Sequence, residues 1–371
     1  MSRPIVAVAV TARPSYSRLR SLLEHLRGWA DVHLVVVGSA LLERYGNVAS
    51  LIGDGYTTHK AWTVVEGETL ETTARSTALA ILDVGTILRN ISPDAVVVHA
   101  DRHEVLGVAI AARYQELPLV HLQGGEQTGS IDDRVRDAIT QLADLHLVST
   151  HMAALRVREV RPGAKVVTTG CPSIDIAAEA TRLPPVTLAD LGGDGADIDL
   201  SKRFLVVLQH PVSDHANLSH LEMLETLKAV KMTGLPAVVF WPGNEAGTDK
   251  SSKAIREMRH EFPIHTVRNL PPERFLKLLT QSACLVGNSS VGIRECSALG
   301  VRVVNIGDRQ VNRAKWHNVL DAEPNRFKIE GAIRAQLAMS RPAKSTLYGD
   351  GTGGRKMSDA IKGWMGERWN S

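Results

Sequence analysis

Several side chains that can move protons stand directly after apolar, β-branched runs of the sequence. A carboxylate, Asp101, and an imidazole, His210, each follow such a run, and a pair of carboxylates that includes Asp132 precedes a helical pattern. Carboxylates and imidazoles at strand exits suit general acid–base catalysis. Structural roles compete with this interpretation, because Asp101 can cap a helix and the aspartate pair can complement a helix dipole.

A second group of residues suits an anion. Residues 287–295, GNSSVGIRE, close an apolar run with small residues, so that backbone N–H groups and the hydroxyls of Ser289 and Ser290 can approach a phosphate. Glu295, about one turn into the next helix, can accept hydrogen bonds from ribose hydroxyls. Arg13 suits a phosphate or a nucleobase edge, although alone it is more simply a solvated arginine. Because the pattern matches neither a Walker loop nor a dinucleotide fingerprint, we predict a diphosphate site without metal or nicotinamide.

The elements that must position these residues alternate between strand and helix along the whole chain. Apolar runs followed by helical periodicity favour parallel sheets covered by helices on both faces, with ligands beyond the carboxyl ends of the strands. The sequence predicts an α/β protein with one domain at 1–178 and another at 203–353. A Pro-, Gly- and Asp-rich linker is expected at 179–202, and a C-terminal helix, 354–371, is expected to pack back on the first domain.

Composition limits the classes of partner and compartment. The 371 residues are 44% hydrophobic and 22% charged, and their net charge of +3 is too small to indicate nucleic acid as the main partner. Cys171, Cys284 and Cys296 lack metal-ligand spacing and are expected to be reduced thiols in or near the core. The N-terminal residues form neither a signal peptide nor a membrane span, so we expect a cytoplasmic protein without membrane association.

Seven short motifs occur in order along nearly the whole chain. They are HADR, HLQGGEQTGSIDDRVRDAIT, GCPSID, LQHPV, GNSSVGIRE, NIGDRQ and LYGDG. Together they resemble the hydrolysing UDP-N-acetylglucosamine 2-epimerases, especially the sialic-acid-pathway branch. The resemblance implies two Rossmann-like domains in a glycosyltransferase-B arrangement, with a nucleotide sugar in the interdomain cleft. It also implies a homodimer that needs no cofactor, removes the C2 proton, expels UDP, and adds water with inversion at C2.

The resemblance also assigns residues. Asp101, Asp132 and His210 match acid–base positions, and Gln123 stands at the position of a catalytic glutamate. The substrate and nucleotide positions implied are Arg13, Arg102, His121, Glu126, Ser289, Ser290, Glu295 and Arg309.

Two positions depart from the family pattern. Ser15 stands where an acidic residue is usual, and the amide of Gln123 cannot take up a proton at neutral pH. The family activity therefore competes with a repurposed enzyme that cleaves or eliminates from another nucleotide sugar, nucleotide or nucleoside without C2 inversion. A retaining glycosyltransferase is disfavoured because it has no use for the acid–base set. A non-catalytic nucleotide-sugar-binding module is disfavoured because it needs no such groups.

Overall fold

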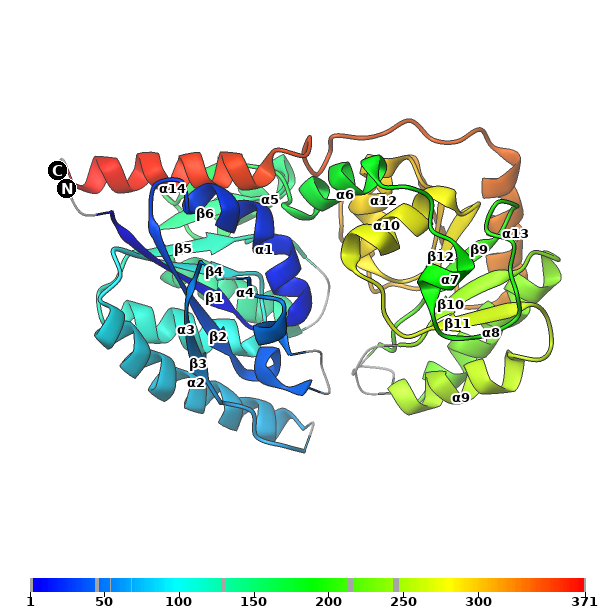
Figure 1. Ribbon diagram of the computed structural model, residues 1–371, viewed down its shortest axis with the longest axis horizontal. Helices are drawn as coiled ribbons and strands as arrows, with labels where there is room; N and C mark the ends of the chain where they lie inside the picture. Colours follow the sequence, from blue (N-terminus) through cyan, green and yellow to red (C-terminus); the bar gives the residue numbers. More distant parts are fainter. Residues whose placement is uncertain are drawn as a thin grey trace. The chain divides into compact units, whose positions relative to one another are not determined.

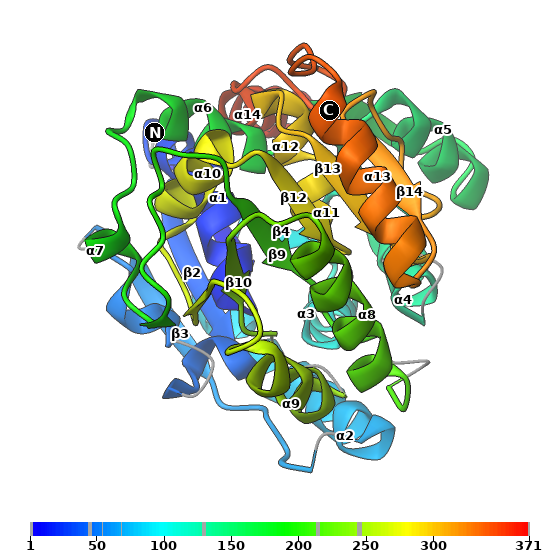
Figure 2. The ribbon, with the colours of Figure 1, turned by 90° about the vertical axis from the view of Figure 1, so that its right-hand side faces the viewer.

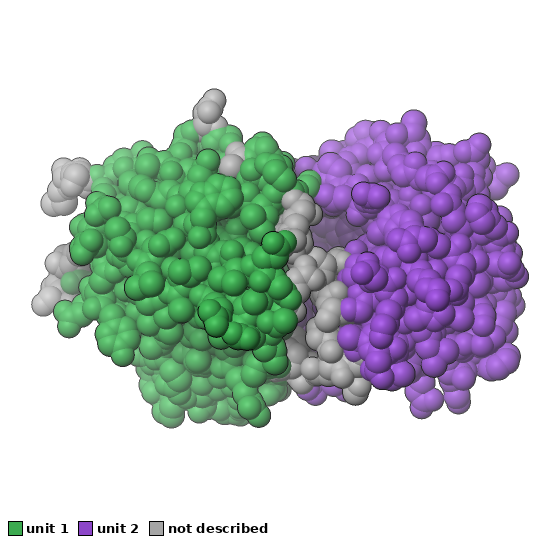
Figure 3. Space-filling model, turned by 90° about the horizontal axis from the view of Figure 1, so that it is seen from below, with its two compact units in different colours: residues 1–175, 349–371 green, residues 176–348 purple. Residues whose placement is uncertain are grey.

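The chain forms two compact units in the computed structural model, which describes residues 3–43, 47–53, 55–67, 69–127, 131–212, 216–242 and 247–369. The first unit comprises Met1–Asp175 and Gly349–Ser371, and the second comprises Ile176–Tyr348 (Figure 1, Figure 3). The chain thus passes between the units twice. The predicted domain limits, 1–178 and 203–353 with a linker at 179–202, stay a prediction.

A seven-stranded parallel sheet organises the first unit, with strand order β3-β2-β1-β4-β5-β6-β7. The central strands consist of buried apolar residues, as expected for a sheet covered on both faces. The strands are β1 (Ile5–Val10), β2 (Asp31–Val37), β3 (Thr57–Ala61), β4 (Ala95–His99), β5 (Leu119–Leu122), β6 (Leu145–Val148) and β7 (Lys165–Thr168).

Two layers of helices cover this sheet. α1 (Arg13–Leu26) and α14 (Gly353–Trp369) share one core with the sheet, whereas α2 (Leu70–Ile91), α3 (His103–Arg113) and α4 (Ile131–Leu142) share the other. α5 (His151–Val160) packs beside β6 and β7, and the short 3-10 turns are Gly38–Leu41 and Val48–Ser50. The buried carboxylate of Asp175 accepts hydrogen bonds from the N–H groups of Gly353 and Gly354, each at 2.8 Å. It therefore fixes the beginning of α14 on the first unit.

The second unit repeats the scheme with the order β14-β13-β12-β9-β10-β11-β8, in which only β8 runs antiparallel. The order reverses between β9 and β12, as it does between β1 and β4 in the first unit. Such reversal points open a crevice at the carboxyl ends of the strands. The strands are β8 (Asp194–Gly195), β9 (Leu205–Leu208), β10 (Ala237–Phe240), β11 (Ile264–Val267), β12 (Cys284–Gly287), β13 (Val303–Ile306) and β14 (Val319–Ala322).

The helices of the second unit also form two layers. α8 (Ser219–Met232), α9 (Thr248–Met258) and α13 (Arg326–Ala338) lie side by side on one face (Figure 2). The core on the other face includes α6 (Ser173–Arg182), α7 (Leu188–Leu191), α10 (Pro272–Gln281), α11 (Ser290–Ile293) and α12 (Glu295–Leu299).

Residues 179–202, the predicted linker, contain the end of α6, all of α7 and the edge strand β8. Leu191, Ile198 and Leu200 from this segment are buried in the second unit's core. Cys171, Cys284 and Cys296 are buried, and none of the three forms a disulfide. A search of the described residues finds no helix whose length and apolarity would allow it to span a bilayer.

Candidate active site

Asp101 leaves β4 through a backbone geometry that needs support. Ala100, the residue before it, has a φ of +65°, which is rare for a residue with a side chain. The fully buried His121 ring binds the Ala100 carbonyl through Nε2 at 2.9 Å and the Thr140 hydroxyl through Nδ1 at 3.2 Å. Burial lowers the pKa of His121 to about 4, so the ring is neutral at pH 7 and Nε2–H donates to the carbonyl. His121 therefore supports the turn that presents Asp101.

A buried guanidinium, that of Arg136, holds the carboxylate of Asp101. The Arg136 side chain is 2% exposed and pairs with Asp101 and, at 2.7 Å, with Asp133. It also donates to the Glu126 carbonyl. The carboxylates themselves keep 23% and 21% of their surface. The charge that fixes the two carboxylates is thus shielded from water while their oxygens stay accessible.

Asp132 is exposed in the first turn of α4, beside this ion pair in sequence. Its charge acts on His103, the first residue of α3: burial lowers the pKa of His103, and the charges of Glu104 and Asp132 partly oppose that effect. The beginnings of α3 and α4 therefore meet where Asp101 leaves its strand, and both predicted acidic groups lie in this region.

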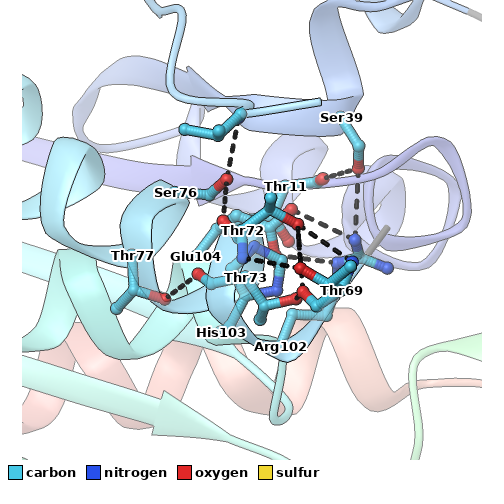
Figure 4. A network of polar contacts seen from close by, with 11 residues as sticks. Thr11, Ser39, Thr69, Thr72, Thr73, Ser76, Thr77, Arg102, His103 and Glu104 are labelled. Atoms are coloured by element: carbon cyan, nitrogen blue, oxygen red, sulfur yellow. Dashed lines mark hydrogen bonds and ion pairs between the residues drawn. The ribbon is translucent and has the colours of Figure 1, made fainter. Parts of the chain in front are cut away.

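Arg102 joins a polar network that ties three strand ends together. Its Nε and one terminal nitrogen donate to the Glu104 carboxylate at 3.1 Å each, and the same terminal nitrogen donates to Ser39 at 3.2 Å. Ser39 in turn donates to the Thr11 carbonyl at 3.0 Å, and Figure 4 shows these contacts together. Burial alone would raise the pKa of Glu104, but Arg102 outweighs burial and holds that pKa low. Arg102 thus fixes the turns after β1, β2 and β4.

Gln123 directly follows β5 with a φ of +61° and only 3% of its surface exposed. Its N–H donates to the Leu147 carbonyl at 2.9 Å, and its Nε2 donates to the Cys171 sulfur at 2.9 Å. Glu126, farther along the turn, accepts a hydrogen bond from Ser149 at 3.2 Å. Both predicted site residues are therefore anchored to neighbouring strand exits, Gln123 to those of β6 and β7 and Glu126 to that of β6.

In the second unit, an asparagine side chain ties two strand exits together. The Asn288 amide accepts from the His210 N–H and donates to the His210 carbonyl, both at 2.8 Å. Asn288 is 2% exposed. Its own carbonyl accepts hydrogen bonds from Gln310 at 3.0 Å and from Arg309 at 3.5 Å. His210 and Arg309 are thus both bonded to the turn that follows β12.

This turn approaches the neighbouring strand very closely. Gly287 has a φ of +146°, and a Cβ there would collide with the Leu208 carbonyl oxygen, so glycine is required. Ser290 accepts a hydrogen bond from Arg294 at 3.0 Å, and Ser289 makes no side-chain cap on α11. Glu295 is 5% exposed, and its Oε2 has no hydrogen-bond partner among the described residues. A buried carboxylate oxygen of this kind suits ligand hydroxyls.

The structure groups the predicted residues by unit. The first unit carries Arg13, Asp101, Arg102, His121, Gln123, Glu126 and Asp132, all within or just beyond the carboxyl ends of its strands, with Arg13 at the start of α1. The second unit carries His210, Ser289, Ser290, Glu295 and Arg309 in the corresponding places. The described ranges contain no group of three or more His, Cys, Asp or Glu side chains arranged to hold a metal ion.

Sequence reasoning did not assign roles to three residues that organise these sites. They are Arg136, Cys171 and Asn288. The three-residue spacing from Asp133 to Arg136 could have indicated an ion pair on one helix face. Nothing local marks Cys171, whose partner Gln123 is 48 residues away.

Comparisons with known proteins agree over nearly the full chain. A family model described as UDP-N-acetylglucosamine 2-epimerase matches residues 25–362. The UDP-N,N'-diacetylbacillosamine 2-epimerase (hydrolyzing) of Legionella pneumophila is 28% identical over 369 residues, covering 98% of this chain and 96% of that protein. The UDP-N-acetylglucosamine 2-epimerase of Neisseria meningitidis serogroup B is 27% identical over 347 residues, covering 92% and 89% respectively.

A solved structure confirms the predicted α/β fold class of two Rossmann-like domains. It is the Methanocaldococcus jannaschii UDP-GlcNAc 2-epimerase in complex with UDP-GlcNAc and UDP. The match has a TM-score of 0.78 at 15% identity, and it covers 96% of this chain and 99% of that chain.

Proposed function

The chain belongs to the UDP-N-acetylglucosamine 2-epimerase family, whose members are enzymes acting on nucleotide sugars, and from that membership we propose a hydrolysing member. The proposed reaction converts UDP-N-acetylglucosamine and water into UDP and N-acetylmannosamine. The observation that carries the proposal is the carboxylate of Asp101, presented at a strained strand exit and paired with a buried guanidinium. Such strain and burial are typical of functional groups rather than of surface charges.

The first step is an elimination. A base takes the C2 proton, its electron pair forms the C1–C2 double bond, and the C1–O bond breaks, so that UDP leaves with the anomeric oxygen. We assign the base to the carboxylates of the first unit, Asp101 and Asp132. Asp101 suits this role because Arg136 fixes its position while its oxygens stay accessible. His210, bonded to the turn that follows β12, supplies a proton to the departing diphosphate.

The second step adds water across the double bond. The hydroxyl joins C1. A proton is added to C2 on the face opposite to the one from which the first proton was removed, which gives the manno configuration. Inversion requires proton carriers on both faces of the sugar. Asp101 and Asp132 follow different strands, at the beginnings of α3 and α4, so two separate carboxylates are available.

The nucleotide is assigned to the second unit. The Ser289–Ser290 turn, Arg309 and the helix that begins at Ser290 meet the negative charge that grows on the diphosphate. Glu295 accepts hydrogen bonds from the ribose hydroxyls, and Arg13 adds a cation from the first unit. We further propose that the enzyme is a cytoplasmic homodimer and that the reaction needs no cofactor.

Gln123 favours a second candidate function. An amide at the position of a family glutamate removes one proton carrier, and Ser15, two residues after Arg13, stands where an acidic residue is usual. A glycosyl hydrolase acting on a related nucleotide sugar needs fewer proton carriers than a 2-epimerase. This enzyme would release UDP and sugar without touching C2.

One experiment separates the two candidates. The protein is incubated with UDP-N-acetylglucosamine in deuterated water, and the products are followed by NMR. The epimerase must place deuterium at C2 of free N-acetylmannosamine, whereas the hydrolase leaves the original hydrogen at C2. Absence of UDP release from this substrate and from UDP-N,N'-diacetylbacillosamine would refute both candidates.

A further inference from the structure

The Gln123 side chain has a donor and an acceptor in very different surroundings. Its Nε2 donates to the Cys171 sulfur at 2.9 Å in a buried contact. Among the described residues the Gln123 side chain makes no other hydrogen bond, although only 3% of the residue surface is exposed. Oε1 is not among the fully buried atoms that lack a partner, so this oxygen keeps access to the space beyond the strand exit. Its Oε1 is therefore suited to a ligand donor.

Cys171 is itself held in place. Its sulfur lies 2.9 Å from the Ser173 hydroxyl, and both residues are at most 2% exposed. The residue follows β7, while Gln123 follows β5, so the contact spans the exits of three adjacent strands. A thiol is a weak acceptor and a weak donor, and here it accepts the amide N–H. Because the amide group is planar, the hydrogen bond from Nε2 to the sulfur also fixes the direction in which Oε1 points.

We propose that Cys171 is a positioning residue for the reaction: it orients the Gln123 amide so that Oε1 accepts a hydrogen bond from an O–H group. The O–H group belongs to the sugar or to the attacking water. This inference rests on the proposed function. In this proposal, Gln123 acts as a fixed hydrogen-bond acceptor that does not titrate. The amide therefore has a role of its own in the site, beyond the absence of a carboxylate.

The thiol also explains which replacements the site can accept. A serine hydroxyl at position 171 can accept the amide N–H as sulfur does, whereas alanine cannot. Without an acceptor, the amide can rotate and turn Nε2 toward the substrate. Because the two ends of the amide have opposite hydrogen-bonding character, rotation replaces an acceptor by a donor.

The test is a double-mutant cycle measured as UDP release from UDP-N-acetylglucosamine and from UDP-N,N'-diacetylbacillosamine. Cys171→Ala should lower kcat/KM about 3–10-fold, the usual effect of losing one hydrogen bond, and Cys171→Ser should stay within about 3-fold. In a Gln123→Met background, Cys171→Ala should have no further effect, because it acts through the amide. Cys284→Ala, an equally buried cysteine in the second unit, is the matched control and should leave kcat/KM unchanged.

Three outcomes decide the matter. Wild-type UDP release with additive effects of Cys171→Ala and Gln123→Met would overturn the inference and leave the proposed function standing. No UDP release by the wild type would overturn the proposed function, and the inference with it. In a supported cycle, a raised KM for the sugar nucleotide in Gln123→Met identifies a sugar hydroxyl, whereas a lowered kcat with unchanged KM identifies water. Circular dichroism melting confirms that each variant is folded.

Discussion

The two units share a strand order but use their strand ends differently. In the first unit, charged side chains meet: Arg136 lies between Asp101 and Asp133, and two residues with side chains, Ala100 and Gln123, adopt left-handed backbone. In the second unit, the contacts run from side chain to main chain: Asn288 bonds the backbone of His210 on one side and accepts from Gln310 on the other.

This difference is consistent with the roles that we propose for the two units. Proton transfer needs titratable groups whose position and charge are controlled, and buried ion pairs provide that control. Anion binding needs backbone N–H groups at close range, and side chains that brace the backbone provide that geometry. Apart from the nucleotide contact assigned to Arg13 and the proton donor His210, variants at the first unit's site should therefore affect chemistry, whereas variants at the second unit's site should affect nucleotide binding.

The largest expected effect is that of Asp101→Asn. We expect kcat for UDP release to fall by about 10²–10⁴-fold, the usual contribution of a general acid or base, with UDP affinity unchanged. Steady-state kinetics and a calorimetric titration with UDP measure the two quantities. Near wild-type turnover would remove the acid–base role from the first unit.

Arg136→Met is expected to damage both fold and chemistry. It leaves Asp101 and Asp133 without their shared counter-ion, so the free energy of unfolding should fall by about 3 kcal/mol. Arg75→Met, which breaks an exposed pair with Glu71, is the control and should cost less than about 0.5 kcal/mol. Urea denaturation measures both. Equal losses of unfolding free energy in the two variants would show that the buried ion pair stabilises the fold no more than the exposed pair does.

The positions of the sites could be predicted from the sequence, whereas the supporting residues could not. Apolar β-branched runs mark the strands, and parallel strands bring their carboxyl ends to one edge, which places Asp101 and His210 without any structure. The sequence pattern predicts that Arg136 is a surface arginine of an amphipathic helix. Only tertiary packing brings it to Asp101, 35 residues away. Likewise, the order of β5, β6 and β7 decides that Cys171 meets Gln123.

Arg309→Ala tests the second unit. Loss of a charge-assisted hydrogen bond should weaken UDP binding by about 1.5–3 kcal/mol in a calorimetric titration. The kcat measured at saturating substrate should change far less than in Asp101→Asn. Unchanged UDP affinity would refute the assignment of the diphosphate to the turn after β12.

The last comparison separates the units by their response to acid. His121 and His146 are buried in the first unit's sheet, and burial lowers the pKa of His121 to about 4 and that of His146 to about 3. Histidine in the unfolded chain has a pKa near 6.5. Below this pH the unfolded chain therefore binds protons that the folded chain does not bind. Stability should therefore fall as the pH drops from about 6.5 to 4, by about 1.4 kcal/mol per pH unit for each histidine.

His121→Gln keeps a donor for the Ala100 carbonyl and removes one of the two largest histidine titrations. The acid slope in this variant should thus be about 1.4 kcal/mol per pH unit smaller than that of the wild type, measured by urea denaturation at several pH values. Hydrogen exchange should locate the acid-induced opening in the strands of the first unit, with the second unit's strands still protected. Simultaneous opening of both units, or an unchanged slope in His121→Gln, would show that the buried histidines do not distinguish the units.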